Sequence, residues 1–329
     1  MNVARADHTA SVLNNGAVLV TGGWNYDDDA LNSAELFDPT TGNWTTTGSM
    51  NGARAYQTAS VLQNGKVLVT GGKDDNGFLN SAELYDPETG NWTTIVSMNV
   101  ARYSHTASVL QNGKVLVTGG KDDNGILNSA ELYDPETGNW TTIASMSVAR
   151  YSHIASVLQN GKVLVTGGRD DNGILNSGEL YVSTTGSWTT TGNMNVARAD
   201  HTVCVLQNGK VLVAGGEDDS GIFLSIFNSA ELYDPETGNW TTIASMDVAR
   251  YSHTASVLQN GKVLITGGRD DNGILNSAEL YDPETGNWTT IASMSVARYS
   301  HTASVLQNGK VLVTDGLNDG GFLNIAELY

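Results

Sequence analysis

The strongest constraint on this 329-residue chain is a phrase that returns seven times. Each copy opens on Met-x-x-Ala-Arg, runs through an apolar segment to a glycine-rich loop, and ends near Glu-Leu-Tyr. A fixed period in this range is typical of supersecondary units that stack or close into a ring, because each unit must pack on its neighbours to bury its apolar face. We therefore expect one repeat domain over residues 1–329. Its units start near the only methionines in the chain, which are Met1, Met50, Met98, Met146, Met194, Met246 and Met294.

Composition and charge exclude several classes of partner. The formal net charge of −18 would repel both the phosphates of nucleic acid and an anionic membrane surface, so neither is expected to bind. No apolar run is long enough to span a bilayer, and no signal peptide precedes the first copy, which points to the cytoplasm. The single cysteine, Cys204, cannot form an intrachain disulfide and is expected to be a small buried residue.

The copy over residues 98–145 shows the local pattern. Four β-prone segments alternate with turn signals, and Asn-Gly between the first two is a strong hairpin signal. A polar Asp-Asp-Asn-Gly loop and a Pro-Glu-Thr-Gly turn separate the remaining segments. The predicted strands are 105–110, 115–120, 129–134 and 140–145. Four antiparallel strands per unit without a helix are typical of a propeller blade.

The spacing of the marked residues resembles kelch repeats, in which Gly-Gly is followed by Tyr and Trp, here Gly71-Gly72, Tyr85 and Trp92. The Met-x-x-Ala-Arg-x-x-His opening is also similar to kelch modules, including the propeller of galactose oxidase-like proteins. The resemblance implies an all-β fold, a seven-bladed β-propeller of four-stranded antiparallel blades, with the first strand of each blade innermost. The tryptophan strand occurs only six times, so the last blade is expected to lack its outermost strand.

The predicted open edge lies at 324–329, from Asn324 to Tyr329. An unpaired edge is a surface on which another chain can add a strand. The favoured interpretation is that the sequence is a segment of a longer one, and the protein is expected to be a monomer.

Strand alternation sorts the connections onto two faces. The Asn-Gly hairpins and Pro-Glu-Thr-Gly turns share one, called here the hairpin face. The Asp-Asp-Asn-Gly loops and the Met-x-x-Ala-Arg segments, called here the lead-ins, share the other, called the loop face. The loop face carries 19 acidic and 11 basic side chains, a net −8, against −3 on the hairpin face. It also holds nearly all variation between copies, so it is the expected binding face.

A ring of arginines matches a ring of glutamates in number and phase. We predict Arg–Glu pairs at the blade junctions, because the guanidinium fork can hold a carboxylate at two points. The alternative is an arginine-lined mouth that binds an acidic ligand. The arginines are Arg5, Arg54, Arg102, Arg150, Arg198, Arg250 and Arg298, and the glutamates are Glu35, Glu83, Glu131, Glu179, Glu231, Glu279 and Glu327.

Two further sets recur in most copies. Histidines open six of the first strands, and Gln57 takes that place in the second copy, which favours a structural hydrogen bond over a metal ligand. Paired aspartates in the long loops are candidate Ca²⁺ ligands, although plain solvated turns are the default for such pairs. These pairs are Asp74 and Asp75, Asp122 and Asp123, Asp170 and Asp171, Asp218 and Asp219, and Asp270 and Asp271.

Three loops of the loop face, in copies one, five and seven, depart from the consensus sequence of the repeat. These loops add aromatic residues, which supply contact area at a low entropic cost. Trp24, Tyr26, Phe223, Phe227 and Phe322 are therefore predicted to contact a ligand. The alternative is that they fold back and cover the propeller.

The expected function is a non-enzymatic binding or scaffold module that presents the acidic loop face to a protein or carbohydrate partner. Catalysis needs one asymmetric polar set, and near-identical copies do not supply one. Two alternatives stay open: a sugar-modifying kelch enzyme acting in the central funnel, and a recently amplified or designed repeat without specific activity. The Cys–Tyr pair that galactose oxidase-like copper chemistry implies cannot be assembled, so no copper-radical site is expected and Ca²⁺ is the one candidate cofactor.

Overall fold

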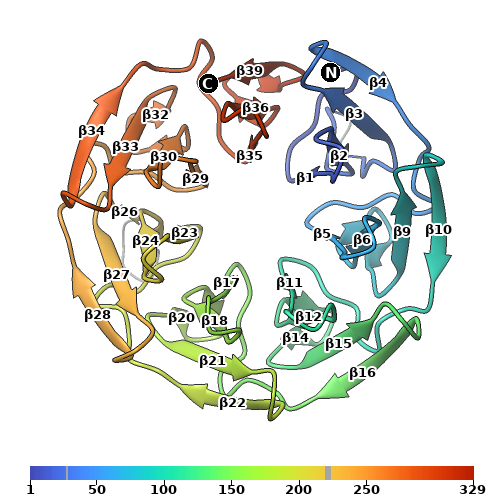
Figure 1. The fold of residues 1–329 in the computed structure, drawn as a ribbon, viewed down its shortest axis with the longest axis horizontal. Helices are drawn as coiled ribbons and strands as arrows, with labels where there is room; N and C mark the ends of the chain where they lie inside the picture. Colours follow the sequence, from blue (N-terminus) through green and yellow to red (C-terminus); the bar gives the residue numbers. More distant parts are fainter. Residues whose placement is uncertain (27–28, 219–223) are drawn as a thin grey trace.

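The computed structural model describes residues 1–26, 29–218 and 224–329. Over these residues, seven antiparallel sheets stand in a ring around a central channel, with the two ends of the chain in neighbouring blades (Figure 1). The predicted seven-bladed propeller is confirmed, and the first strand of each blade is innermost. Within the described ranges the model contains no helix that could cross a membrane.

Six blades arrange four main strands, and blade seven three, in chain order, so that each main strand pairs with the next. The first strands are β1 (Thr9–Val12), β5 (Thr58–Val61), β11 (Thr106–Val109), β17 (Ile154–Val157), β23 (Thr202–Val205), β29 (Thr254–Val257) and β35 (Thr302–Val305). The second are β2 (Val18–Thr21), β6 (Val67–Thr70), β12 (Val115–Thr118), β18 (Val163–Thr166), β24 (Val211–Ala214), β30 (Val263–Thr266) and β36 (Val311–Thr314). The third are β3 (Ala34–Asp38), β9 (Ala82–Asp86), β15 (Ala130–Asp134), β21 (Gly178–Val182), β27 (Ala230–Asp234), β33 (Ala278–Asp282) and β39 (Ala326–Leu328). The fourth are β4 (Asn43–Thr46), β10 (Asn91–Ile95), β16 (Asn139–Ile143), β22 (Ser187–Thr190), β28 (Asn239–Thr242) and β34 (Asn287–Ile291).

The second strands are buried along their whole length because each lies between two neighbouring blades. All four residues of β12 are buried, whereas the first and fourth strands are only partly buried. Met98 is buried with Leu62 and Leu68 of blade two against Val115 and Val117 of blade three. Burying a Val, Leu or Met side chain contributes about 1.5–3 kcal/mol. The methionines that mark the repeat therefore pack between adjacent blades.

The long loops contain more regular structure than the predicted polar turns. In six blades they form two-residue ladders. In blade three an aspartate caps the turn, since Asp122 Oδ1 accepts the backbone N–H groups of Asn124 and Gly125, and in blade seven Asn318 Oδ1 accepts that of Gly320. The ladders are β7 (Lys73–Asp74) with β8 (Gly77–Phe78), β13 (Lys121–Asp122) with β14 (Gly125–Ile126), β19 (Arg169–Asp170) with β20 (Gly173–Ile174), β25 (Glu217–Asp218) with β26 (Ser225–Ile226), β31 (Arg269–Asp270) with β32 (Gly273–Ile274), and β37 (Leu317–Asn318) with β38 (Gly321–Phe322).

Blade seven joins blade one through the same backbone contacts as every other junction. Arg5 N donates to Leu323 O at 3.1 Å, and Gly316 N donates to Arg5 O at 3.1 Å. The corresponding bond between blades two and three runs from Gly72 N to Arg102 O at 2.9 Å. The lead-in of each blade thus binds the loop of the blade before it, and this closes the ring.

Blade seven has three strands, as predicted, because β39 pairs only with β36 among the described residues. Leu328 in β39 keeps 47% of its surface exposed. Addition of a strand from another chain at this edge stays a prediction, as does the monomeric state.

Candidate functional site

A collar of seven residues surrounds the channel on the loop face. Each residue directly precedes the histidine position and has a φ of 49–54°, a left-handed conformation that costs free energy in residues other than glycine. Backbone N–H groups link neighbours: Tyr56 N donates to Asp7 O at 3.2 Å, and Ser152 N donates to Ser104 O at 3.1 Å. The collar consists of Asp7, Tyr56, Ser104, Ser152, Asp200, Ser252 and Ser300.

Asp7 breaks the symmetry of the collar. The hydroxyls of Tyr56 and Ser300 interact with its carboxylate and favour the ionised form, and the Trp24 side chain interacts with the Tyr56 hydroxyl. Burial raises the pKa of Asp7 to about 6, and the charge of Asp200 adds to the rise. Asp7 is therefore mainly ionised at neutral pH. It makes no ion pair with any residue that the structure describes.

Aromatic side chains extend from the collar over blades one to three. The Trp24 and Tyr56 ring centroids lie 6.4 Å apart and those of Tyr56 and Tyr103 6.1 Å apart, each pair inclined by 61°. Tyr103 in turn stacks on Phe78 at 4.7 Å. Inclined pairs are favourable because the positive edge of one ring meets the negative face of the next. Trp24, Tyr56, Tyr103 and Phe78 form the aromatic arc, in which Tyr56 keeps 37% of its surface exposed.

Two of the predicted contact residues, Tyr26 and Phe322, meet near the junction of blades seven and one. Tyr26 Oη donates to Phe322 O at 2.5 Å, and the two rings lie 5.4 Å apart. Tyr26 is 61% exposed, and Trp24 belongs to the same loop. Their contact with a ligand stays a prediction.

Phe227 covers its own blade, in agreement with the alternative interpretation that the added aromatic residues fold back over the propeller. It takes the place that Leu79 has in blade two, since its N–H donates to Gly216 O as that of Leu79 donates to Gly72 O. Its ring centroid lies 5.6 Å from the Arg198 guanidinium carbon. The predictions for Phe223 and Asp219 fall outside the described residues.

Sequence reasoning missed Asp7, Tyr56, Tyr103 and Phe78. A signal for the site was present in blade two, where Ala55-Tyr56 replaces the Tyr-Ser pair found in four other lead-ins. This departure is hard to recognise in the sequence because the long loops vary more between copies than the lead-ins do.

The seven arginines do not line a ligand-binding mouth, and that part of the prediction is wrong. Their side chains are fully buried, so none can reach a ligand. Arg102 Nη1 donates to Gly119 O at 2.8 Å and Nη2 to Glu131 Oε1 at 2.9 Å. The Arg–Glu pairing is confirmed. Each pair joins a lead-in to the third strand of the same blade, rather than crossing a junction, because the lead-in folds back over its own blade.

The paired aspartates do not converge. Among the described residues, no group of three or more His, Cys, Asp or Glu side chains could hold a metal ion. Asp74 Oδ1 accepts the N–H groups of Asn76 and Gly77 within its own turn, and Asp75 accepts that of Ala30. The turn interpretation accounts for these carboxylates, and calcium binding stays a prediction.

Histidine, threonine and alanine side chains from the first strands line the channel, a space of about 550 Å³. His105 Nε2 pairs with Thr58 Oγ1 of the preceding blade at 3.0 Å, and Gln57 Nε2 donates to Thr21 O at 2.9 Å. Burial lowers the pKa of His105 to about 3, so the ring stays neutral. The structural interpretation of the histidines is confirmed.

Asp315 occupies the first glycine position of blade seven and lies at the junction with blade one. Its φ is 57°, its side chain is fully buried, and neither carboxylate oxygen has a hydrogen-bond partner among the described residues. Arg5 Nε and His8 Nε2 each lie 3.9 Å from Oδ2. Burial raises the pKa of Asp315 to about 8. A Cβ at the equivalent Gly71 would lie 2.5 Å from a carbonyl oxygen, which explains why glycine is the rule here.

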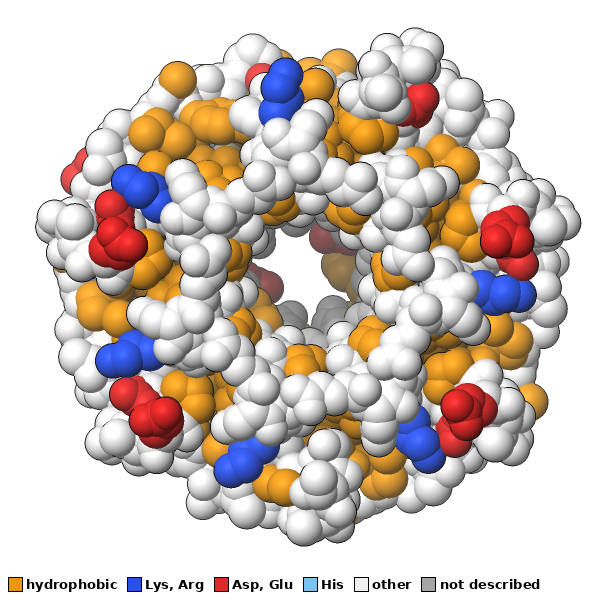
Figure 2. All heavy atoms as spheres, in the orientation of Figure 1, with side chains coloured by type: hydrophobic (Ala, Val, Ile, Leu, Met, Phe, Trp, Pro, Cys, Tyr) orange, Lys and Arg blue, Asp and Glu red, His pale blue; other side chains and the backbone are white. Residues whose placement is uncertain are grey.

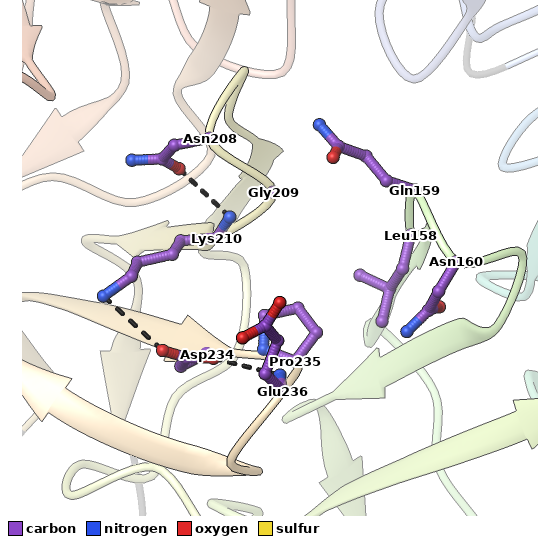
Figure 3. Close-up of a pocket in the computed structure, with 9 residues that line it drawn as sticks. All are labelled: Leu158, Gln159, Asn160, Asn208, Gly209, Lys210, Asp234, Pro235 and Glu236. Atoms are coloured by element: carbon purple, nitrogen blue, oxygen red, sulfur yellow. Dashed lines mark hydrogen bonds and ion pairs between the residues drawn. The ribbon is translucent and has the colours of Figure 1, made fainter.

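The hairpin face carries a hollow between adjacent blades. One hollow, of about 450 Å³, has Leu158, Gln159 and Asn160 on one wall and residues of the next blade on the other (Figure 3). Lys210 Nζ lies 3.6 Å from Asp234 Oδ2. A space-filling view shows basic and acidic side chains near one another around the open centre of the ring (Figure 2). Similar hollows recur between other blades, so this surface lacks the asymmetry of the aromatic arc.

Cys204 is buried, as predicted. Burial raises the pKa of its thiol to about 12, so the thiolate that a nucleophile or metal ligand requires is disfavoured.

Comparison with known proteins agrees with this architecture. The family model of the KLHDC2/KLHL20/DRC7 Kelch-repeats domain matches residues 1–168 and 144–316. No curated protein matches the chain. A fungal alcohol oxidase of the AA5 family, solved in complex with copper, superposes with a TM-score of 0.77 at 20% identity, over 96% of this chain and 70% of its own. YjhT superposes with a TM-score of 0.69 at 16% identity, over 89% of this chain and 98% of its own. At these identities the two structures share the fold alone.

Proposed function

The chain belongs to the family of kelch-repeat propellers, and on this premise we propose that it is a non-enzymatic module that binds a partner protein on its loop face. Kelch domains commonly bind proteins. The observation that carries the proposal is the aromatic arc, because it is an asymmetric and partly exposed apolar surface on the more acidic face. Tyr and Trp are enriched among the residues that contribute most to protein interfaces.

The arc is also held in place before any partner arrives. Tyr56 belongs to the hydrogen-bonded collar, and its ring packs against those of Trp24 and Tyr103. Side chains that are already ordered lose little conformational entropy on binding, so more of the contact energy appears as affinity.

The two alternatives have less support. Repeated His, Thr and Ala side chains line the funnel, and the described histidines there are held neutral, so no blade-specific acid–base set supports a sugar-modifying enzyme. Uniform copying of one repeat does not account for a concentration of departures in neighbouring blades. A carbohydrate partner would also use aromatic faces, and it is an outcome of the test below.

The test uses substitutions that copy one blade onto another. Tyr56→Ser with Phe78→Ile gives blade two the residues of Ser104 and Ile126, so the fold should be retained. Wild type and variant are screened on a random-sequence peptide array and on a glycan array, and positive probes are titrated. We expect peptide binding that the double variant weakens about tenfold or more, as loss of central aromatic contacts does at interfaces.

Lys66→Ala is the matched control, since it copies Ala17 onto the hairpin face of the same blade. It should leave peptide affinity unchanged. The proposal fails if the control loses binding while the double variant keeps it, if only glycans bind, or if neither array gives a saturable signal.

A further inference from the structure

We infer that the aromatic arc recognises a cationic group, the side chain of an arginine or lysine in the partner, above the carboxylate of Asp7. This deepens the proposed function and rests on it. The inference joins three observations: the inclined rings of the arc, the lysines that the protein itself places on such rings, and a carboxylate at the collar without a counter-ion.

The rings have the arrangement that a cation requires. A cation is attracted to the face of Trp or Tyr when it lies within about 6 Å of the ring centroid. Trp24, Tyr56 and Tyr103 follow one another at 6.4 and 6.1 Å with their planes inclined by 61°, so they do not cover each other as a stack would. The exposed part of Tyr56 lies in the middle of this series.

The protein already holds ammonium groups against aromatic rings of the loop face, one of them in the arc. Lys73 Nζ lies 5.3 Å from the Trp24 ring centroid, and Lys121 Nζ lies 5.7 Å from that of Tyr151. Both lysines belong to the loop ladders beside the collar. Lys73 is thus an internal occupant of the Trp24 face, and an incoming cation would compete with it.

The charge at the collar favours the same class of ligand. Asp200 is paired with Arg169 at 3.5 Å, whereas Asp7 interacts only with the neutral hydroxyls of Tyr56 and Ser300 and forms no ion pair among the described residues. The sequence places a net −8 on this face, which repels an acidic partner. A carboxylate beside the Tyr56 side chain is better suited to a cation than to a neutral sugar, because only a cation gains from both the carboxylate and the ring.

The inference is tested by fluorescence anisotropy with a labelled arginine-rich peptide and the same peptide with citrulline, its neutral analogue, at every arginine. Asp7→Asn removes the charge and keeps a residue that tolerates the left-handed backbone. Lys73→Gln removes the internal competitor, and Lys66→Gln removes the same charge from the hairpin face of the same blade. Thermal melting checks that each variant is folded.

The arginine peptide should bind about tenfold more tightly than the citrulline peptide. Asp7→Asn should abolish most of the preference for the arginine peptide over the citrulline peptide. Lys73→Gln should strengthen binding of the arginine peptide about threefold, whereas Lys66→Gln should change this affinity by less than about twofold. Equal binding of the two peptides, or equal effects of the two lysine substitutions, would overturn the inference. If both peptides bind equally and Tyr56→Ser with Phe78→Ile still weakens them, the proposed function survives and only the cation class is wrong. Failure of either peptide to bind overturns the cation class as well.

Discussion

Arg102 Nη2 donates to Glu131 Oε1 at 2.9 Å, and neither side chain has any surface exposed to solvent. The same carboxylate accepts the backbone N–H groups of Asn99 and Val100, so the pair fastens the lead-in to the third strand. The equivalent pair recurs in every blade, with N–O distances of 2.6 to 3.3 Å.

Arg102→Met should lower the free energy of unfolding by about 3–5 kcal/mol, because it leaves Glu131 charged and unpaired in the interior. Urea denaturation measures the change. Arg102→Lys keeps the charge but cannot reproduce the planar fork, so about half of the loss is expected to remain. A loss below about 1 kcal/mol for Arg102→Met would mean that the pair is not structural.

Asp315→Gly should stabilise the protein by on the order of 2–4 kcal/mol near pH 8, since it removes both a buried carboxyl group that has no hydrogen-bond partner among the described residues and a left-handed non-glycine residue. The pKa of Asp315 in the folded state, about 8, lies above the ordinary value of 3.8. The folded state therefore holds the proton more tightly, and the stability lost to Asp315 grows as the pH rises from about 4 to about 8.

Thermal melting of wild type and Asp315→Gly across this pH range measures the difference. The gain should be small near pH 4 and largest near pH 8. A gain that does not change with pH would show that backbone strain, rather than the carboxyl group, is the cause.

His105→Gln should be tolerated, because Gln57 fills the same place in blade two. The pKa of His105 in the folded state, about 3, lies below the ordinary value of 6.5, so its unfolded form binds a proton first as the pH falls. His105 thus lowers stability progressively below about pH 6.5, and this acid sensitivity should be reduced in the variant. Urea midpoints at pH 8 and pH 5 test both points, and His105→Leu, which cannot bond Thr58, is the destabilised comparison.

Trp140→Phe should cost about 1 kcal/mol, because the Trp140 indole N–H donates to Val96 O of the preceding blade at 2.9 Å. Trp44 is the matched control, since its indole has no acceptor among the described residues beside three-stranded blade seven. Trp44→Phe should therefore cost clearly less. Equal losses of unfolding free energy in urea for the two variants would show that ring packing, and not the hydrogen bond, holds the fourth strands.

The repeated residues allowed most of the fold to be predicted, and part of the site. Met98 marks a blade boundary, and Arg102, Glu131 and the histidines have the structural roles that their strict recurrence suggested. The prediction of an arginine-lined mouth was wrong because a sequence period does not show whether a side chain points into the interior or toward the opening. Tyr103 was missed because a residue that recurs in several lead-ins suggests a structural role. Its place in the aromatic arc follows only from its neighbours in the folded protein.

The sequence by itself determined the number of blades, the order of their strands and the missing outer strand of the last one, because these follow from a period that local hydrophobic pattern and turn chemistry impose on every copy. Only the tertiary structure decided that Asp7, Tyr56 and Trp24 lie together at the collar, and that Asp315 meets Arg5 and His8 across the closing junction. Asp315 and Arg5 lie at opposite ends of the chain, and Asp7 and Tyr56 lie in different copies. Closure of the ring brings the residues of each pair together. These contacts join different copies, so the sequence pattern within one repeat does not predict them.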